Sequence, residues 1–466
     1  MSAAASPSDS ARPAARRAPV AAVLLGAGLG TRMKSDRPKV LQPIAGRPMV
    51  QHVLAALDPL EPARRAVVVG PGMEESVGRA VAPYAVAVQR ERLGTAHAVT
   101  AARAALDGFT DGTVLILFGD TPFVSAETLQ AMTAAREAGA DVVVLGFQAA
   151  DPTNYGRLIA GPDGALERIV EHRDASEAER AVRLCNSGVM AVSAAVLFNL
   201  IDRVGADNAK GEYYLTDIVG LARGEGRTCA VIEADEAELL GVDSKADLAE
   251  AEALWQRARR RHAMEQEGAL LLDPSSVWFS WDTVLGRDVT VGQNVVFGPG
   301  VTVEPGAEIR PFCHLEGCLV RSGAQIGPFA RLRPGAEIGE AARIGNFVEV
   351  KNARLADGAK ANHLAYIGDA EVGAHANIGA GTITCNYDGY LKHRTVIGPG
   401  AFIGSNSALV APVEIGAGAI VGAGSTVTDD VAPDALAVAR GAQTELEGAA
   451  ARFRERKAAE KKARKG

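Results

Sequence analysis

Two different spacings of apolar residues divide the chain into two parts. From Val20 to about Asp247, apolar runs alternate with segments of helical periodicity. Strands are predicted at 20–25, 64–70, 113–120 and 141–147, and helices at 51–60, 95–106 and 125–139. Alternating strands and helices are typical of a mostly parallel, doubly wound α/β sheet. Such sheets bind ligands beyond the carboxyl ends of their strands.

Later in the chain the apolar period becomes six. Apolar residues recur at every sixth position from Leu285 to Val427, with single slips and one interruption at 384–394. Small residues stand four positions after many of them: Ala330, Ala336, Ala342, Ala401, Ser407 and Ala419. The pattern predicts a hexapeptide β-helix, in which the apolar residue points inward and the small residue fits the corner. Stacking of the coils supplies the core.

A helix is predicted between the two parts, because Ser244 and Asp247 resemble a capping box. The predicted organisation is a disordered tail (1–19), an α/β domain (20–243), a linker helix (244–268), a β-helix domain (269–440) and a basic tail (441–466). Two interpretations of the basic tail stay open. It is either a solvated, partly helical end, or a contact to an anionic ligand or a neighbouring subunit.

Composition excludes several classes of protein. The net charge of the 466 residues is −7, so no basic field points to nucleic acid. No stretch approaches the ~18 to 20 apolar residues of a membrane span, and residues 1–19 lack the apolar stretch of a signal peptide. The five cysteines form no CxxC pair, which fits a reducing compartment. We therefore expect a cytoplasmic protein with neither nucleic acid nor membrane as a partner.

The segment LLGAGLGTRMKSDRPKV (24–40) follows the first predicted strand. Its three glycines fit neither the dinucleotide-binding fingerprint nor the Walker loop. Glycine lets backbone N–H groups approach phosphate oxygens closely. Arg32 adds a forked donor, and Lys39 adds a point charge on a flexible stem. The segment therefore predicts a phosphate site.

The same segment resembles the LAAGxGTRM…PK signature of sugar-nucleotide pyrophosphorylases. Over roughly residues 20–440 the chain is most similar to the bifunctional bacterial N-acetylglucosamine-1-phosphate uridylyltransferase/glucosamine-1-phosphate acetyltransferase family. The shared motifs include QRERLGTAHA, YGRL, NSGV, GEYYLTDIV, GNFVEVKNA, NHLAYIGDAEVG and NIGAGTITCNYDG. The resemblance implies an N-terminal Rossmann-like nucleotidyltransferase domain and a C-terminal left-handed hexapeptide β-helix with acetyltransferase activity.

For the first domain, the resemblance implies a reaction of UTP with N-acetylglucosamine-1-phosphate. Arg32 and Lys39 would neutralise phosphate charge, while Asp120 and Asp243 would hold Mg²⁺. The family usually has Asn at the position of Asp243. Nucleotide and sugar contacts are implied at Gly28, Lys39, Gln89, Gly94, Thr95, Gly156, Glu171 and Asn186. Smaller departures from the family are Gly26 for Ala, Phe118 for Tyr and Ser187 for Thr; none removes a charge.

For the second domain, the resemblance implies acetyl transfer from acetyl-CoA to glucosamine-1-phosphate. A lone histidine is more often a surface or packing residue. His363, however, would take a proton from the attacking amino group, and Glu349 would hold its imidazole. Substrate contacts are implied at Arg333, Glu349, Lys351, Tyr366, Asn377 and Lys392. Acetyl-CoA contacts are implied at Ala380, Asn386, Tyr387, Ser405, Ala423 and Arg440. A homotrimer with acetyl sites between subunits is implied too.

Two other functions stay open at this point. The first is a single-activity sugar-1-phosphate nucleotidylyltransferase whose β-helix is regulatory; the set of polar residues around His363 disfavours it. The second is a non-catalytic hexapeptide assembly protein that senses a nucleotide sugar; Asp120, Arg32 and Lys39 disfavour that function. In the favoured interpretation, the β-helix makes N-acetylglucosamine-1-phosphate and the first domain converts it to UDP-N-acetylglucosamine and pyrophosphate.

Overall fold

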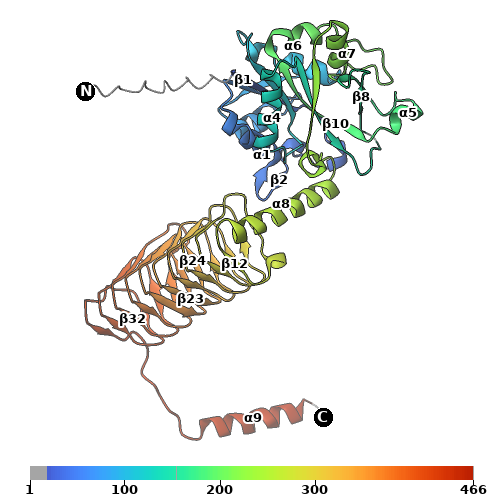
Figure 1. Ribbon diagram of the computed structural model, residues 1–466. Coiled ribbons are helices and arrows are strands. Elements are labelled where there is room, and N and C mark those ends of the chain that lie inside the picture. Colours follow the sequence, from blue (N-terminus) through green and yellow to red (C-terminus); the bar gives the residue numbers. More distant parts are fainter. Residues whose placement is uncertain (1–17, 154, 465–466) are drawn as a thin grey trace, which may run out of the picture. The chain divides into compact units, whose positions relative to one another are not determined.

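The computed structural model describes residues 18–153 and 155–464 (Figure 1). The chain divides into two compact units, one that ends at Gln256 and one that begins at Arg257. The tail predicted at residues 1–19 falls outside the described residues, except for its last two positions.

The first unit is built on a nine-stranded sheet whose main path runs β11-β7-β10-β6-β1-β4-β5. Its strands are β1 (Val20–Gly26), β4 (Arg64–Val69), β5 (Ala85–Val88), β6 (Thr113–Phe118), β7 (Val142–Gln148), β8 (Arg157–Ala160), β9 (Leu166–Val170), β10 (Leu184–Ser193) and β11 (Cys229–Glu233). All pairings on this path are parallel except those of β10, which runs antiparallel to β6 and β7. The β8–β9 hairpin is attached to β10. A small hairpin, β2 (Pro43–Ile44) and β3 (Arg47–Pro48), precedes the first helix.

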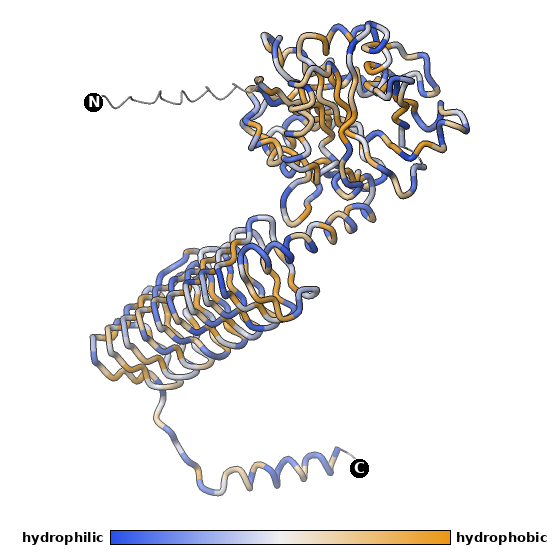
Figure 2. The backbone as a smooth tube through the Cα atoms, in the orientation of Figure 1, coloured by the Kyte–Doolittle hydropathy of each residue, from blue (hydrophilic) through white to orange (hydrophobic). Residues whose placement is uncertain are grey.

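Helices cover both faces of this sheet, as Figure 1 shows. One face packs against α1 (Met49–Ala56), α2 (Glu74–Val81) and α4 (Ala126–Glu137), and the other against α3 (Thr95–Ala101), α6 (Ala194–Ile201) and α7 (Asp217–Gly224). In β1, Val23 joins one core and Leu24 the other, since successive strand residues face opposite sides. Figure 2 shows the central strands as the most hydrophobic part of the unit. The predicted doubly wound fold is confirmed.

Helix α8 (Lys245–Glu265) falls within the segment predicted to be helical. The Ser244 hydroxyl accepts from the Asp247 N–H at 3.2 Å, while the Ser244 N–H donates to the Asp247 carboxylate at 2.8 Å. This reciprocal pair satisfies backbone groups at the helix start, so the predicted capping box is confirmed. Leu248 and Ala251 of the first turns pack against Met33 and Met49.

The second unit is a three-sided β-helix of parallel strands (Figure 1). Its first sheet runs from β12 (Leu270–Leu271) to β37 (Leu436–Ala437) and includes β23 (Arg343–Asn346), β26 (Lys360–His363), β29 (Asn377–Ile378), β32 (Phe402–Ile403) and β35 (Ile420–Val421). Its second runs from β15 (Val296–Phe297) to β36 (Thr426–Val427) and includes β18 (His314–Leu315), β21 (Arg331–Leu332), β24 (Glu349–Lys351), β27 (Tyr366–Gly368) and β30 (Ile383–Cys385). Its third runs from β13 (Val284–Leu285) to β34 (Val413–Ile415) and includes β22 (Ala336–Ile338), β25 (Ala353–Leu355), β28 (Ala370–Val372) and β31 (Thr395–Ile397).

The six-residue period corresponds to one side of this helix. Every apolar position predicted to point inward, from Leu285 to Val427, is at most 4% exposed. The small corner residues are buried as well. Residues that pair between neighbouring coils are 16 to 18 positions apart, except across the interruption at 384–394, where they are 25 apart. The predicted left-handed hexapeptide β-helix is confirmed.

A column of exposed apolar side chains follows the corner between the first and second sheets. This corner ladder consists of Phe312, Phe329, Phe347 and Leu364. The rings of Phe312 and Phe329 stack at 4.8 Å between centroids, and those of Phe329 and Phe347 at 5.3 Å. All four residues have positive φ, between 49° and 61°, which bulky residues rarely adopt.

The chain ends with the exposed helix α9 (Ala449–Ala463), so the basic tail is partly helical as predicted. Figure 2 shows it as largely hydrophilic. Among the described residues, no helix has the length and hydrophobicity needed to span a membrane.

Candidate functional site

A cavity of about 280 Å³ opens at the carboxyl ends of β1 and β6. The glycine loop after β1 forms one wall, and the turn between β5 and α3 forms another. Its lining includes the predicted site residues Gly28, Lys39, Gln89, Gly94, Thr95 and Asp120. A Cβ atom on Gly28 would meet no protein atom within 4 Å. Packing therefore does not demand glycine there, whereas a ligand lying against the bare backbone would.

Lys39 lies at the centre of an ion cluster in this cavity. Its ammonium contacts the Asp120 carboxylate and lies 2.8 Å from Asp243 Oδ1, and Arg32 Nη2 lies 2.9 Å from Asp243 Oδ2. Burial by itself lowers the pKa of Lys39, but the Asp120 carboxylate and then the Asp243 carboxylate outweigh it and raise the pKa above its ordinary value. All four sequence-predicted charged residues therefore converge at one point.

The cluster also bears on metal binding. Asp120 and Asp243 direct carboxylate oxygens at the same Lys39 ammonium, so the two carboxylates face a common point. Within the described part of the chain, no group of three or more acidic, histidine or cysteine side chains has the arrangement of a metal site. Two carboxylates suit Mg²⁺, which commonly takes one or two of them together with substrate phosphates and water.

The turn between β5 and α3 holds the residues predicted to read the nucleobase. Gln89 is 4% exposed, and its amide Nε2 donates to the Gly94 carbonyl at 3.0 Å. Gly94 has φ of 114°, and a Cβ there would lie 2.4 Å from the Tyr213 carbonyl oxygen, so only glycine fits. The Thr95 hydroxyl accepts from the Leu215 N–H at 2.9 Å. Contacts with Tyr213 and Leu215 thus hold this turn in place at the wall of the cavity.

The three residues predicted to contact the sugar meet at the start of β8. The Asn186 N–H donates to the Gly156 carbonyl at 2.8 Å. A Cβ on Gly156 would lie 3.5 Å from Glu171 Oε1 and 3.6 Å from Asn186 Cβ. Burial raises the pKa of Glu171; Lys210 opposes this effect, and Asp174 and Asp217 add to it.

Charged residues predicted for the β-helix site gather on the second sheet. Arg333 Nη1 donates to Glu349 Oε1 at 2.8 Å, and Arg331 Nη1 lies 3.8 Å from Glu349 Oε2. The hydrogen bond to Glu349 raises the pKa of Arg333. Tyr366 of β27 pairs with Glu349 of β24 in the second sheet. Lys351 is the last residue of β24.

His363 lies at the corner before this sheet, and its partner was not foreseen. His363 Nδ1 lies 2.8 Å from Asn346 Oδ1, whereas the resemblance implies Glu349 as the residue that holds the imidazole. The Glu349 carboxylate instead forms ion pairs with Arg331 and Arg333. Asn346 precedes His363 by one coil and pairs with it between β23 and β26. The 17-residue spacing was the signal in the sequence that could have identified it.

A column of small residues continues from His363 along the same corner. His363, Ala380, Ser405 and Ala423 each stand two positions after an inward residue, and those inward residues stack in register. Arg440 comes one coil further, and its guanidinium donates to the Ala423 carbonyl. The structure thus aligns His363 with four of the predicted acetyl-CoA residues.

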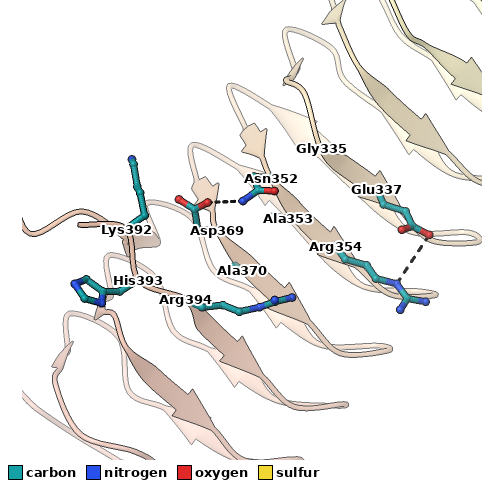
Figure 3. Close-up of a pocket in the computed structure, with 10 residues that line it drawn as sticks. All are labelled: Gly335, Glu337, Asn352, Ala353, Arg354, Asp369, Ala370, Lys392, His393 and Arg394. Atoms are coloured by element: carbon teal, nitrogen blue, oxygen red, sulfur yellow. Dashed lines mark hydrogen bonds and ion pairs between the residues drawn. The ribbon is translucent and has the colours of Figure 1, made fainter. Parts of the chain in front are cut away.

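The remaining predicted residues lie elsewhere within one chain. Asn377 begins β29 of the first sheet, while Asn386, Tyr387 and Lys392 belong to the loop between β30 and β31. The Asn386 amide donates to Asp369, and Lys392 Nζ lies 4.9 Å from the Tyr387 ring centroid. Lys392 lines a second cavity, of about 310 Å³, beside the third sheet (Figure 3).

Comparison with known proteins agrees with this geometry. Residues 22–196 match the family described as MobA-like NTP transferase domain, and residues 394–429 match bacterial transferase hexapeptide repeats. Proteins named bifunctional protein GlmU are similar over nearly their whole length. The chain is 63% identical to that of Rhodospirillum rubrum, across 93% of this chain and 97% of the relative. It is 60% identical to that of Paramagnetospirillum magneticum, across 95% and 98%. The chain belongs to the bifunctional GlmU family.

Membership in the GlmU family confirms the predicted function. The protein is an enzyme that combines a glucosamine-1-phosphate N-acetyltransferase with an N-acetylglucosamine-1-phosphate uridylyltransferase. The two alternatives, a regulatory β-helix and a non-catalytic sensor, are therefore wrong.

Departures from the usual GlmU residues have local structural partners. Phe118, in place of Tyr, packs against Gly188, where a Cβ would lie 2.6 Å from the ring. The Ser187 hydroxyl, in place of Thr, donates to the Leu145 carbonyl at 2.7 Å. A Cβ on Gly26, in place of Ala, would lie 3.3 Å from Val40 and from the Val68 carbonyl oxygen. Asp243, in place of Asn, binds both Arg32 and Lys39 and thereby adds a second carboxylate to the ion cluster.

Proposed function

We propose that the cavity at the ends of β1 and β6 is the uridylyltransferase site and that the corner at Asn346 and His363 is the acetyltransferase site. The observation that carries the assignment is that each unit contains one cluster suited to one of the two reactions. Lys39 with its two carboxylates suits phosphoryl chemistry. A histidine held by one ring nitrogen suits proton transfer from an amine.

In the first reaction, an oxygen of N-acetylglucosamine-1-phosphate attacks the α-phosphorus of UTP, and pyrophosphate leaves on the opposite side. The attacking oxygen is already anionic, so no general base is needed. Arg32 and Lys39 bind and orient the phosphates, and the bare backbone at Gly28 lets them approach closely. Positioning and charge neutralisation supply the catalysis.

Asp120 and Asp243 are the residues that would hold Mg²⁺. When bound, the ion would supply positive charge that neutralises the phosphates. Without substrate, the same carboxylates neutralise Lys39. The phosphates of an arriving substrate can therefore pair with the Lys39 ammonium. The carboxylate oxygens of Asp120 and Asp243 are then no longer bound to Lys39. Asp243 contributes one more negative charge than the asparagine usual in the family.

Selection of base and sugar follows from two further groups. The Gln89 amide has both a donor and an acceptor, which the imide edge of uracil requires. Gly94 and Thr95 complete that wall of the cavity. Glu171 accepts from a sugar hydroxyl, Asn186 can both donate and accept, and Gly156 allows close approach of the acetamido group.

In the second reaction, His363 acts as the general base. Asn346 Oδ1 can only accept, so it fixes the proton on Nδ1 and leaves the lone pair on Nε2. Nε2 takes the proton as the 2-amino group attacks the thioester carbonyl, and that proton passes to the departing CoA thiolate. Arg333, Lys351 and Lys392 bind the sugar phosphate, while Tyr366 and Asn377 orient the ring. Glu349 holds the Arg333 guanidinium in place.

Acetyl-CoA lies along the column of small residues that continues from His363 toward Arg440. Ala380, Ser405 and Ala423 present only small side chains, so an extended ligand can lie along them. Arg440 at the far end is suited to a CoA phosphate. Asn386 and Tyr387, on the loop after β30, form the other wall.

The acetyltransferase acts as a homotrimer in the cytoplasm. Asn377 and Lys392 lie on other sides of the β-helix than the Arg333–Glu349 pair, so a second copy would bring them to the site. The corner ladder ends at Leu364, directly after His363, and offers this copy an apolar surface. A Phe329→Asp variant is expected to sediment as a monomer and lose acetyl transfer. Phe453→Asp in α9 is the control.

The first experiment follows free CoA thiol when the protein meets acetyl-CoA and glucosamine-1-phosphate, with His363→Ala beside the wild type. Release that the mutant largely loses would support the second site. Pyrophosphate release from UTP and N-acetylglucosamine-1-phosphate, dependent on Mg²⁺, tests the first site. A wild-type protein that folds and assembles but releases neither product would overturn both assignments.

A further inference from the structure

Arg92 links three segments at the mouth of the nucleotide cavity. It stands in the turn that carries Gln89 and Gly94, and its Nε donates to the Ala27 carbonyl of the glycine loop at 2.9 Å. Its Nη2 also fills the space above Gly70, directly after β4: a Cβ on Gly70 would lie 2.4 Å from Nη2 and 3.0 Å from the Ala27 oxygen. The guanidinium therefore connects the ends of β1, β4 and β5.

The charge environment of Arg92 differs from that of Lys39. Both line the cavity, but Lys39 contacts two carboxylates. Arg92 forms no ion pair with any residue between 18 and 464 that the structure describes, and the Ala27 carbonyl is its one hydrogen-bond acceptor among them. Four of the five guanidinium donors thus stay available on a group whose orientation is already fixed.

We propose that Arg92 is a positioning residue for uridylyl transfer. It holds the glycine loop at a fixed separation from the base-reading turn, so that the nucleotide enters a preformed slot between Ala27 and Gln89. The inference rests on the proposed uridylyltransferase site and assigns a role to a residue that lies within the QRERLGTAHA motif but for which the resemblance implied no contact. Only arginine can do this, because lysine has no donor in the middle of a rigid planar group.

The experiment compares Arg92→Gln, Arg92→Lys and Gly70→Ala with the wild type. Arg90→Gln is the matched control, since Arg90 lies in the same turn and is exposed like Arg92, but only Arg92 belongs to the cavity lining. For each protein we would measure UTP affinity by calorimetry, KM and kcat for UTP and for N-acetylglucosamine-1-phosphate, and the acetyl-transfer rate. The last rate reports whether the chain has folded and assembled.

We expect UTP binding to weaken about tenfold or more in both Arg92 variants, the order expected for one hydrogen bond to a charged group. Gly70→Ala should reproduce this loss with the arginine still present, because it displaces the guanidinium. KM for the sugar phosphate and the acetyl-transfer rate should stay unchanged, as should all values for Arg90→Gln.

Three outcomes would overturn the inference. Wild-type UTP affinity in Arg92→Lys would make charge alone sufficient, and wild-type affinity in Arg92→Gln would remove any role. An equal loss of acetyl transfer would make Arg92 a residue of general stability. By contrast, a wild type that binds no UTP and releases no pyrophosphate would refute the proposed site itself, whatever the variants do.

Discussion

The two units bring functional side chains together in different ways. In the first unit, Lys39 and Asp243 are 204 residues apart and meet where strands of one sheet end. In the β-helix, Asn346 and His363 are 17 residues apart and meet because one coil stacks on the next. The first site therefore depends on the topology of a whole domain, whereas the second depends on local stacking. A substitution should therefore be able to inactivate either site while the other keeps its activity.

Loss of the base is expected to have the largest effect. His363→Ala should lower the acetyl-transfer rate about 10² to 10⁴-fold, because it removes the group proposed to take the proton from the attacking amine. Uridylyl transfer should stay at the wild-type rate. The matched control is His314→Ala, on the exposed side of β18, which should change neither rate. Both rates are measured on one preparation.

Asp120→Asn should have the opposite selectivity. We expect uridylyl transfer to fall about a hundredfold or more, because a carboxylate is lost from the pair facing Lys39. Acetyl transfer should persist. Pyrophosphate and CoA thiol release, assayed side by side, distinguish the two activities. Equal loss of both would contradict the separation of the sites.

Asn346→Ala tests how the histidine is oriented. Acetyl transfer should fall about 10 to 100-fold, as is usual when a residue that orients a functional histidine is removed. Asn346→Asp keeps an acceptor at Nδ1 and should retain more activity. If Glu349 were the group that orients the imidazole, Asn346→Ala would leave the rate unchanged.

Glu171 predicts a pH dependence for the first site alone. Folding raises its pKa, chiefly through burial. As the pH falls through this raised value, the carboxyl gains a proton and accepts less well from the sugar. The value of kcat/KM for N-acetylglucosamine-1-phosphate should therefore decrease at a pH above the ordinary range of glutamate. Glu171→Gln should be weakly active and flat over that range. Because its pKa is raised in the folded state, the ionised form of Glu171 also lowers the free energy of unfolding. This destabilisation disappears as the pH falls through the raised pKa.

Two buried threonines of the β-helix predict the smallest effects, and these are opposite in sign. The Thr395 hydroxyl has no hydrogen-bond partner within the described chain, so Thr395→Val should stabilise the domain by about 1 kcal/mol. The Thr384 hydroxyl accepts from the Gly368 N–H at 2.8 Å and donates to its carbonyl at 3.0 Å. Thr384→Val should destabilise the domain by about 1 to 3 kcal/mol. Thermal unfolding of both variants checks the pair.

The repeating coils of the β-helix and the strands with uninterrupted apolar runs could be predicted from the sequence. Inward positions such as Ile326 and Ile403 follow from the period of six, and β1, β4, β6 and β7 follow from apolar runs. Strand β10 was not predicted, because Asn186, Ser187 and Gly188 interrupt its apolar run at a bulge.

Partners that come from three-dimensional arrangement were also missed. Family motifs identified His363 and Glu349, but which of them contacts Asn346 depends on strand register. Arg92 looks like any surface arginine until the ends of three strands meet around it. The partner of His363 could be found only from the 17-residue spacing of the coils, whereas the convergence of strand ends at Arg92 is a property of the folded sheet that no local pattern encodes.

The stacked corner also acts as a ruler. Each coil advances the chain by one strand spacing, about 4.8 Å, so the four coils from His363 to Arg440 span about 19 Å. Deleting one whole coil between them would keep the hydrophobic lining continuous but shorten this span by about 4.8 Å. The length of the acyl carrier that reaches from base to arginine is thus determined by a whole number of coils.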